Sequence, residues 1–399
     1  MQTKNISLCS FFALAILMVA CQKLGPPIPK DNSILDGPLE GLSTQQSKQF
    51  LKGDVAFNDE VFTEATGLGP VFVATSCGSC HAGDGKGTPF TTLTRFGQHD
   101  GSGNLFLELG GPQLQNRAIP GYVPEQLPAG ATFSKFTPPS NTGLGYLELV
   151  GDADIIAMAD EYDADGDGIS GVPNWKSIPS YITPTPGTVA NNGKYLCRFG
   201  KKAGAYNLLE QTVNAYNQDL GITSLYEPHD VASGLEFDPE VSTQTIHDVV
   251  FYLQTLKAPI QRNQGDAEVV YGKQLFIDAG CEKCHRQTLT TGYSPIAALS
   301  YQQFHPFTDL LLHDMGSALD DGYTEGSALT AEWRTPPLWG IGLSPMSQGG
   351  VYYLMHDGRA SSIEEAILMH GGEAATSSTN YQNLSQSDKN ALLKFLESL

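Results

Sequence analysis

The sequence of 399 residues lacks several features that identify common classes of protein. Beyond its first twenty residues, no apolar run is long enough to cross a membrane. There is no phosphate-binding glycine loop, no low-complexity tract, no His-x-x-Glu-type zinc motif and no convincing serine nucleophile. These absences argue against a membrane-spanning protein, a P-loop enzyme and a hydrolase of the zinc or serine type.

Positive charge is also scarce. The chain has 23 Lys and Arg residues against 43 Asp and Glu residues, which gives a formal net charge of −20. This balance argues against nucleic acid as a partner and favours a basic protein partner, although the same charge also serves solubility. The length and the apolar content of 40% allow a large core and suggest two domains, while 43 glycines and 24 prolines predict a loop-rich fold.

The N-terminus carries an apolar run, Phe11–Ala20, that follows Lys4 and is too short to span a bilayer. It predicts a secretory signal. The run ends in LMVAC, so Cys21 lies where bacterial lipoproteins accept their lipid; an ordinary signal peptide is the alternative. We expect a signal peptide over residues 1–20, a tether over 21–47, and a protein of the periplasm or cell envelope that is lipid-anchored through Cys21.

Only seven cysteines are present. Cys9 leaves with the signal, Cys21 is the lipid site, and Cys197 has no obvious partner. The remaining four form two Cys-x-x-Cys-His motifs, at Cys77–His81 and Cys281–His285. In an oxidising compartment, a bare CxxC pair tends to become a disulfide. The added histidine is instead typical of c-type haem attachment, in which the cysteines form thioethers and the histidine binds iron.

Two other chemistries use CxxC pairs. Zinc would require both pairs to share one ion, and thioredoxin-type chemistry would require a βαβ context. Two CxxCH motifs in an exported chain favour haem over both. We therefore predict two covalently bound haem c groups, held by Cys77, Cys80, His81, Cys281, Cys284 and His285.

The segments around the motifs favour a mainly α fold of two cytochrome c-like domains, with a long insertion after the first haem site. Apolar residues at helical spacing, Val270, Leu275 and Phe276, predict a helix that runs into the second motif. A looser version of this pattern precedes the first motif, with Val61, Phe62, Val71 and Phe72. Residues 386–399 predict a terminal helix capped by Ser385, with an apolar face of Leu392, Phe395, Leu396 and Leu399. We place the domains at 48–260 and 261–399.

The sixth ligand of the second haem iron has two candidates. Ser362 and Glu365 form a capping-box pattern, and Gly371 ends the helix that they begin. His370 lies on the apolar face of this helix, and Met369 is about 100° away from it. Methionine is the commoner sixth ligand in electron-carrying cytochromes, so both residues stay open at this point.

Five segments of the chain carry a family resemblance, namely GGPQLQNRAIPG, RFGKKA, FTDLLLHDMG (Phe307–Gly316), EWRTPPLWGIG (Glu332–Gly342) and HDGRASSIEEAILMHGGEA (His356–Ala374). They resemble the bacterial di-haem oxidoreductases and peroxidases that are also labelled thiol oxidoreductases. The resemblance covers about Phe50 to Leu399 and is most specific in the C-terminal motifs. More distantly, the chain is similar to the di-haem cytochrome c peroxidases, in which a distal methionine follows the HDG motif at the spacing of His370. The resemblance therefore implies His370 rather than Met369 as the ligand.

The resemblance also implies a different state for the first haem. His99 lies in a glycine-rich loop near the spacing of a displaceable distal histidine in the peroxidases; it is equally a candidate for a solvated loop residue. If it does not bind, the iron is open to peroxide. The peroxidases place Gln and Glu beside the open face, and their motif is not reproduced here. The nearest polar set, which we take as candidate catalytic residues, is Gln113, Gln115 and Arg117; structural hydrogen bonding by at least two of them is the alternative.

An acidic segment between the haem motifs begins like an EF-hand calcium loop. Asp163, Asp165 and Asp167 occupy the alternating positions, and Gly168 stands at position six. Position twelve is Asn174 in place of the bidentate Glu. We expect one calcium ion here; a bare acidic turn is the alternative.

Taken together, these patterns predict a di-haem c-type oxidoreductase that resembles a peroxidase. Electrons would arrive from a small soluble donor cytochrome or similar redox protein, enter at the C-terminal haem and be used at an open N-terminal haem. The alternative is a non-enzymatic di-haem electron carrier in which both irons are six-coordinate.

Overall fold

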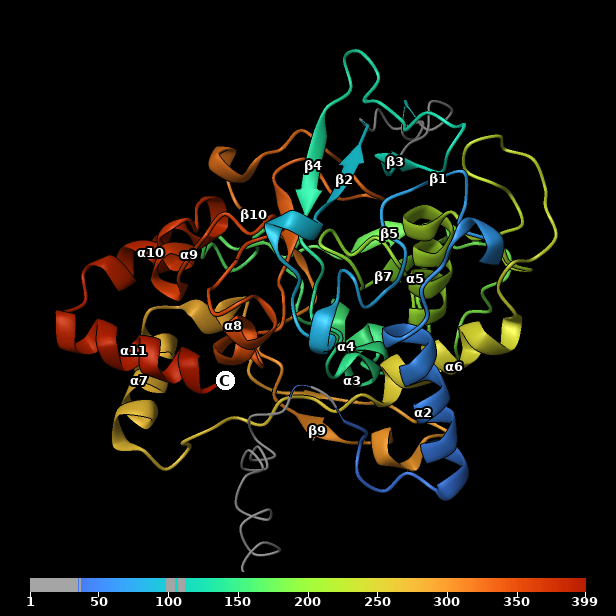
Figure 1. Cartoon of the computed structure of the whole chain (residues 1–399). Coiled ribbons are helices and arrows are strands. Elements are labelled where there is room, and N and C mark those ends of the chain that lie inside the picture. The colour runs from blue at the N-terminus through green and yellow to red at the C-terminus, as the bar shows by residue number, and fades with distance from the viewer. Residues whose placement is uncertain (1–34, 36, 98–104, 107–111) are drawn as a thin grey trace, which may run out of the picture. The chain divides into compact units, whose positions relative to one another are not determined.

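The computed structural model describes residues 35, 37–97, 105–106 and 112–399. Figure 1 shows how the elements of this part are arranged. The predicted signal peptide, Cys21 and His99 lie outside the described residues. None of the described helices combines the length and the apolar character that a membrane span requires.

Helices are the main regular elements, and they are separated by long loops (Figure 1). The α-helices are α2 (Thr44–Asn58), α3 (Leu144–Glu148), α4 (Asp152–Ile156), α5 (Leu208–Asn214), α6 (Thr243–Thr255), α7 (Ala267–Asp278), α8 (Ser344–Ser347), α9 (Ile363–Leu368), α10 (Ala375–Gln382) and α11 (Gln386–Ser398). The strands are β1 (Val71–Phe72), β2 (Leu93–Phe96), β3 (Arg117–Ala118), β4 (Phe133–Phe136), β5 (Asn174–Lys176), β6 (Ala190–Asn191), β7 (Lys194–Cys197), β8 (Leu289–Thr290), β9 (Gln303–Phe304), β10 (Leu312–Asp314) and β11 (Glu332–Arg334).

The strands form small antiparallel sheets rather than one continuous sheet. Pairs are made by β1 with β3, β2 with β4, β8 with β9 and β10 with β11, while β7 lies between β5 and β6. In the β2–β4 pair, Leu93 lies opposite Phe136 and Phe96 lies opposite Phe133. These short ribbons brace the loops of the long insertion and of the C-terminal half.

The N-terminal half is organised around the packing of α2 on α6 (Figure 1). Ser43 caps α2 in a capping box with Gln46. The two helices meet at Gly53, where a Cβ atom would overlap the Asp248 carbonyl oxygen. One turn later, the Phe57 and Tyr252 rings lie 5.6 Å apart. Glycine thus permits a close helix crossing that a larger residue would prevent.

The C-terminal half repeats this arrangement with α7 and α11 (Figure 1). These helices meet at Gly272, where a Cβ atom would overlap the Ala391 carbonyl oxygen. One turn later, Phe276 and Phe395 lie 5.5 Å apart. In both halves the glycine precedes the aromatic residue by four positions on the first helix of the pair. Two similarly built helix pairs fit a largely helical, loop-rich, cytochrome-like fold.

The two largest clusters of buried side chains also follow the division into an N-terminal and a C-terminal half. One core cluster, which includes Phe57 and Tyr252, draws most of its members from Phe50–Leu256, and a second, which includes Phe276 and Phe395, comes entirely from Val269–Leu399. The predicted terminal helix is confirmed, because Ser385 caps α11. Its predicted apolar face is buried throughout, namely Leu392, Phe395, Leu396 and Leu399.

Three details differ from the expectations. In α7 the buried valine is Val269, whereas Val270 is 57% exposed, because the helical repeat places residue 269 in line with Phe276. Before the first motif, α2 ends at Asn58, so Val61 lies in an exposed loop segment and Val71–Phe72 form a strand. The end of the expected tether is not free, because Leu39 is buried and α2 begins at Thr44.

Candidate functional site

Both CxxCH motifs line one cavity of about 400 Å³. The first motif follows β1, and the second begins directly after α7 with a one-turn helix, Cys281–Lys283. The helix crossings position both motifs, since the Phe57 ring lies 5.9 Å from His81 and the Phe276 ring lies 6.4 Å from His285. Residues that are distant in sequence are therefore brought to a common space.

Each motif folds as a tight turn. The His81 amide donates to the Cys77 carbonyl at 3.0 Å, and the His285 amide donates to the Cys281 carbonyl at the same distance. These turns place both cysteines and the histidine of each motif on the cavity wall. All four sulfurs are free and partly buried.

The histidine rings of both motifs are oriented by backbone carbonyls. His81 Nδ1 lies 3.0 Å from the Pro139 oxygen, and His285 Nδ1 lies 3.0 Å from the Phe307 oxygen. Such a bond holds the proton on Nδ1 and leaves the Nε2 lone pair for a metal. Burial lowers the pKa of each ring to about 4, which keeps the ring neutral. This donor set fits the proximal ligand of a c-type haem.

Zinc shared between the two cysteine pairs finds no support in the described part of the chain, where no cluster of potential metal ligands contains sulfurs of both pairs. Burial raises the pKa of Cys77 and of Cys281 to about 12, which disfavours thiolate chemistry. Cys197 is buried and remote from these pairs, with only a weak contact to the Tyr195 carbonyl.

His370 also faces the cavity. It follows α9, which Ser362 caps by accepting a hydrogen bond from the Glu365 amide at 3.0 Å. His370 Nδ1 lies 2.7 Å from the Ala366 carbonyl oxygen, so this ring repeats the arrangement of the two motif histidines. Met369 is not part of the cavity wall and packs against the C-terminal core instead.

Two further histidines on the cavity wall are already bound to carboxylates. His356 Nε2 lies 2.7 Å from Asp321, and its ring stacks on Trp333 at 3.7 Å. His313 contacts Asp309 at 2.9 Å and Glu373 at 2.7 Å. Both rings therefore have fixed partners, unlike the three histidines that are bonded only to carbonyls.

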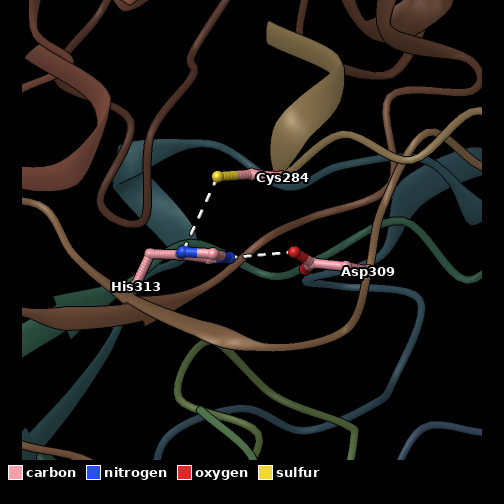
Figure 2. A group of neighbouring side chains, drawn as sticks. All are labelled: Cys284, Asp309 and His313. Carbon is pink, nitrogen blue, oxygen red and sulfur yellow. Dashed lines mark hydrogen bonds and ion pairs between the residues drawn. The ribbon is translucent and has the colours of Figure 1, made fainter. Parts of the chain in front are cut away.

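His313 also approaches the second haem motif. Figure 2 shows its ring between Asp309 and Cys284, with Nδ1 3.6 Å from the Cys284 sulfur. Burial opposes charge on this ring, but its bonds to Asp309, Cys284 and Glu373 together raise the pKa of His313 well above the ordinary value. No spacing in the sequence indicated this group, because Cys284 and the Asp309–His313 segment are brought together only by the fold.

The candidate catalytic residues do not line the cavity. Gln113 and Gln115 are buried, and their side chains hold the end of the helix after α5: Gln113 bonds Asp219, and both amides donate to the Gln218 carbonyl. Arg117 is exposed on β3. Asp219, which the sequence did not indicate, does line the cavity. Burial raises the pKa of Asp219 to about 6, opposed by its bond from Gln113.

The wall beside Asp219 contains two hydroxyl groups without partners. After α5 the chain continues into one turn of π-helix, Ala215–Asp219. Thr212 and Tyr216 belong to the cavity lining, and their buried hydroxyl oxygens make no hydrogen bond within the described structure. Buried polar groups without partners are rare, and π-turns are frequent at functional sites.

The acidic loop keeps part of the expected arrangement. The Gly168 amide donates to Asp163 at 3.0 Å, as position six does to position one in an EF-hand. Asp163 and Asp165 come together with Asp160, while Asp167 forms an ion pair with Lys283 at 2.9 Å. Through this ion pair, the loop is attached to the second haem motif.

Comparison with known proteins identifies the family. The family model "Di-haem oxidoreductase, putative peroxidase" matches residues 135–399, well over half of the chain. The chain therefore belongs to this family of di-haem oxidoreductases. The matched region contains the second motif and His370, whereas Cys77–His81 precedes it.

The other comparisons are more distant. A solved structure of hydrazine synthase from Kuenenia stuttgartiensis, pressurized with xenon, is similar at 15% identity and a TM-score of 0.40, covering 94% of this chain and 95% of that chain. At this distance the likeness defines neither fold detail nor function. No curated protein matches the chain.

Proposed function

We propose that this protein is a c-type di-haem oxidoreductase of the peroxidase type, in which electrons enter at the second motif and are used at the first. The observation that carries this proposal is the unequal supply of carbonyl-oriented histidines on the cavity wall. His285 and His370 provide two imidazoles for the second motif, whereas His81 is the one such imidazole on the side of the first motif among the described residues.

Haem bound at these motifs would supply one-electron chemistry at iron. On the chain's side, Cys77 and Cys281 head the attachment motifs, and the Pro139 and Phe307 carbonyls hold the proximal rings by their Nδ1 atoms. His370 is the proposed second ligand of the iron at the second motif. A bis-histidine site is expected to hold a low potential compared with a His/Met site.

The residues beside the first motif can bind and deprotonate a small oxidant. Asp219 influences the pKa of Cys77 and Cys80 by its charge, so its carboxylate lies close to this motif. It is positioned to accept a proton from hydrogen peroxide. Gln113 acts on Asp219 and is a positioning residue in this proposal.

The cellular setting remains part of the same proposal. The motif at Cys21 supports a lipid-anchored protein of the periplasm or cell envelope. The net charge of −20 supports a small, basic redox protein as the electron donor.

The experiment starts by counting haem. Denatured protein should carry two haems per chain that acid–acetone does not extract, and extractable cofactor or bound zinc would contradict covalent attachment. Hydrogen peroxide should then consume electrons from both haems of the reduced protein. His81→Gly should abolish this reaction, and His305→Gly, at an exposed histidine, should not change it.

The electron-carrier alternative gives a different result. A carrier needs six ligands on both irons, so that little rearranges when an electron is transferred. If the protein is instead an oxidoreductase with an open iron at the first motif, electron paramagnetic resonance should detect a high-spin signal from the haem at His81 in at least one redox state. Low-spin spectra from both haems in every redox state, together with no reaction with peroxide, would leave the carrier as the function.

A further inference from the structure

The cavity wall carries more positive than negative charge, in contrast to the protein as a whole. Its lining includes five Lys and Arg side chains and only two carboxyl groups, those of Asp219 and Glu325. Two of the cations are neutralised, because Arg95 pairs with Glu325 at 2.7 Å and Arg198 pairs with Asp152. The remaining cations are Lys86, Lys201 and Arg334.

These three side chains, the cation cluster, have no ion-pair partner within the described part of the chain. Lys201 Nζ donates to the Thr137 hydroxyl at 3.3 Å, and Arg334 donates to backbone carbonyls at 2.9 and 3.1 Å. No bond from the Lys86 amine to any described residue is present. Partly buried cations are costly without a counter-charge, so their arrangement calls for an anion.

The members of the cation cluster also lie close enough to repel one another. Burial, then Lys86, then Arg334 lower the pKa of Lys201 to about 7. Burial lowers the pKa of Lys86 to about 8 and that of Arg334 to about 10. Burial is the largest cause of each shift, and Asp357 and Asp309 act in the opposite direction on the pKa of Lys201 and of Arg334.

The cation cluster lies between the two motifs. Lys86 follows the first motif closely in sequence, and the charge of Lys201 lowers the pKa of His81. Arg334 interacts electrostatically with Asp309, the carboxylate that binds His313 beside the second motif.

We infer that Lys86, Lys201 and Arg334 form a carboxylate-binding site, and that the carboxylates are the propionates of the haem attached at Cys77–His81. This inference rests on the proposed covalent haem. A haem carries its two propionates at the edge away from its thioethers, and the cation cluster comprises the Lys and Arg side chains of the cavity lining that form no ion pair within the described part of the chain. A free carboxylate substrate is the other source of the same chemistry.

The test measures the midpoint potentials of both haems by spectroelectrochemical titration. A cation near a haem favours the reduced iron, so Lys86→Gln and Lys201→Gln should each lower the potential of the haem at His81 and shift it more than that of the other haem. Lys86→Gln is the sharper variant, because it removes a charge and no hydrogen bond to a described residue. Lys86→Arg should restore the potential, and Lys135→Gln, at an exposed lysine, should leave it unchanged.

Resonance Raman spectroscopy distinguishes the two carboxylate sources. Loss of a propionate partner should move the propionate-bending bands of the Lys86→Gln and Lys201→Gln proteins to lower frequency. Unchanged bands and potentials in both variants, in protein that carries two covalent haems, would overturn the inference and leave the proposed function intact. Unchanged bands, with added acetate perturbing the wild-type spectrum but not that of the variants, would assign the site to a free carboxylate.

Discussion

At the scale of single residues, three imidazoles share one device. His81, His285 and His370 each bond a backbone carbonyl through Nδ1 and lie on the cavity wall. A carbonyl cannot lose its acceptor character as pH changes, so it holds the ring in one tautomer more reliably than a titratable partner would. His313 and His356, which bond carboxylates, lack this arrangement.

The first prediction concerns His370. If it is the second axial ligand at the second motif, His370→Ala should convert that haem from low-spin to high-spin. Met369→Leu serves as the control, because Met369 packs in the core and should leave the spectrum unchanged. Absorption and electron paramagnetic resonance spectra provide the measurement, and the reverse pattern would make Met369 the ligand.

The second prediction concerns Asp219. Its pKa of about 6 is raised by burial, so the carboxylate form that accepts a proton becomes populated as pH rises through about 6. The rate of the peroxide reaction should rise over the same interval. Asp219→Asn should slow the reaction on the order of a hundredfold and remove this pH dependence. A pH dependence that survives in the variant would assign the titration to another group.

At the scale of secondary-structure elements, two helix pairs with glycine crossings determine where the motifs lie. Gly53 and Gly272 allow α2 to approach α6 and α7 to approach α11 at backbone contact. The aromatic residue one turn later then contacts the motif histidine. The crossing geometry thus helps to set the position of His81 and of His285.

The third prediction follows from this crossing. Gly272→Ala should destabilise the fold by about 3 kcal/mol or more, because its methyl group would overlap the Ala391 carbonyl, which belongs to the helix backbone and cannot rotate away. Thermal or denaturant unfolding provides the measurement. Gly265→Ala, just before α7, has no atom within 4 Å of the new methyl group and should change stability by less than about 0.5 kcal/mol. Equal effects of the two substitutions would contradict this account.

The fourth prediction concerns the acidic loop. We propose that it binds calcium, which would stabilise the folded protein by mass action. A chelator should then lower the melting temperature, and Asp165→Ala should abolish this sensitivity. Asp154→Ala, at an exposed carboxylate on α4, should retain it. A chelator effect that persists in Asp165→Ala would place the ion elsewhere.

At the scale of the whole molecule, the charge of the cavity wall is opposite in sign to the net charge of the chain. The chain as a whole carries −20, but the cavity wall is positive. The acidic exterior suits a basic electron donor, and the positive interior suits anionic groups held between the two motifs. Positive charge near an iron raises its reduction potential, so a positive cavity wall benefits a protein that transfers electrons between internal sites.

Local sequence patterns predicted local structure well. The cap at Ser385 and the spacing of Leu392, Phe395 and Leu396 predicted α11, since capping and helical periodicity act within one element. The same reasoning placed His370 on the inner face of its helix. It was wrong about Val270, where adjacent valines differ in burial only through the partner helix.

The position of a side chain that depends on contacts between segments distant in the sequence could not be predicted from the spacing of residues along the chain. Gln113 and Gln115 are polar and close to the first motif in sequence, yet they support Asp219 from behind the cavity wall. Asp219 itself lies far along the chain from that motif, and only the packing of α5 brings it there. Polar residue type indicates a capacity for chemistry, but not the direction in which a side chain points.

The sequence by itself determined the two attachment motifs, the family resemblance and the helices that begin and end each half, because all of these are encoded by neighbouring residues. Tertiary structure alone decided that both motifs open onto one cavity, and that Lys86, Lys201 and Arg334 line it without an ion-pair partner in the described part of the chain. The physical reason is that burial and electrostatic interaction depend on distance through space, which a linear pattern does not contain.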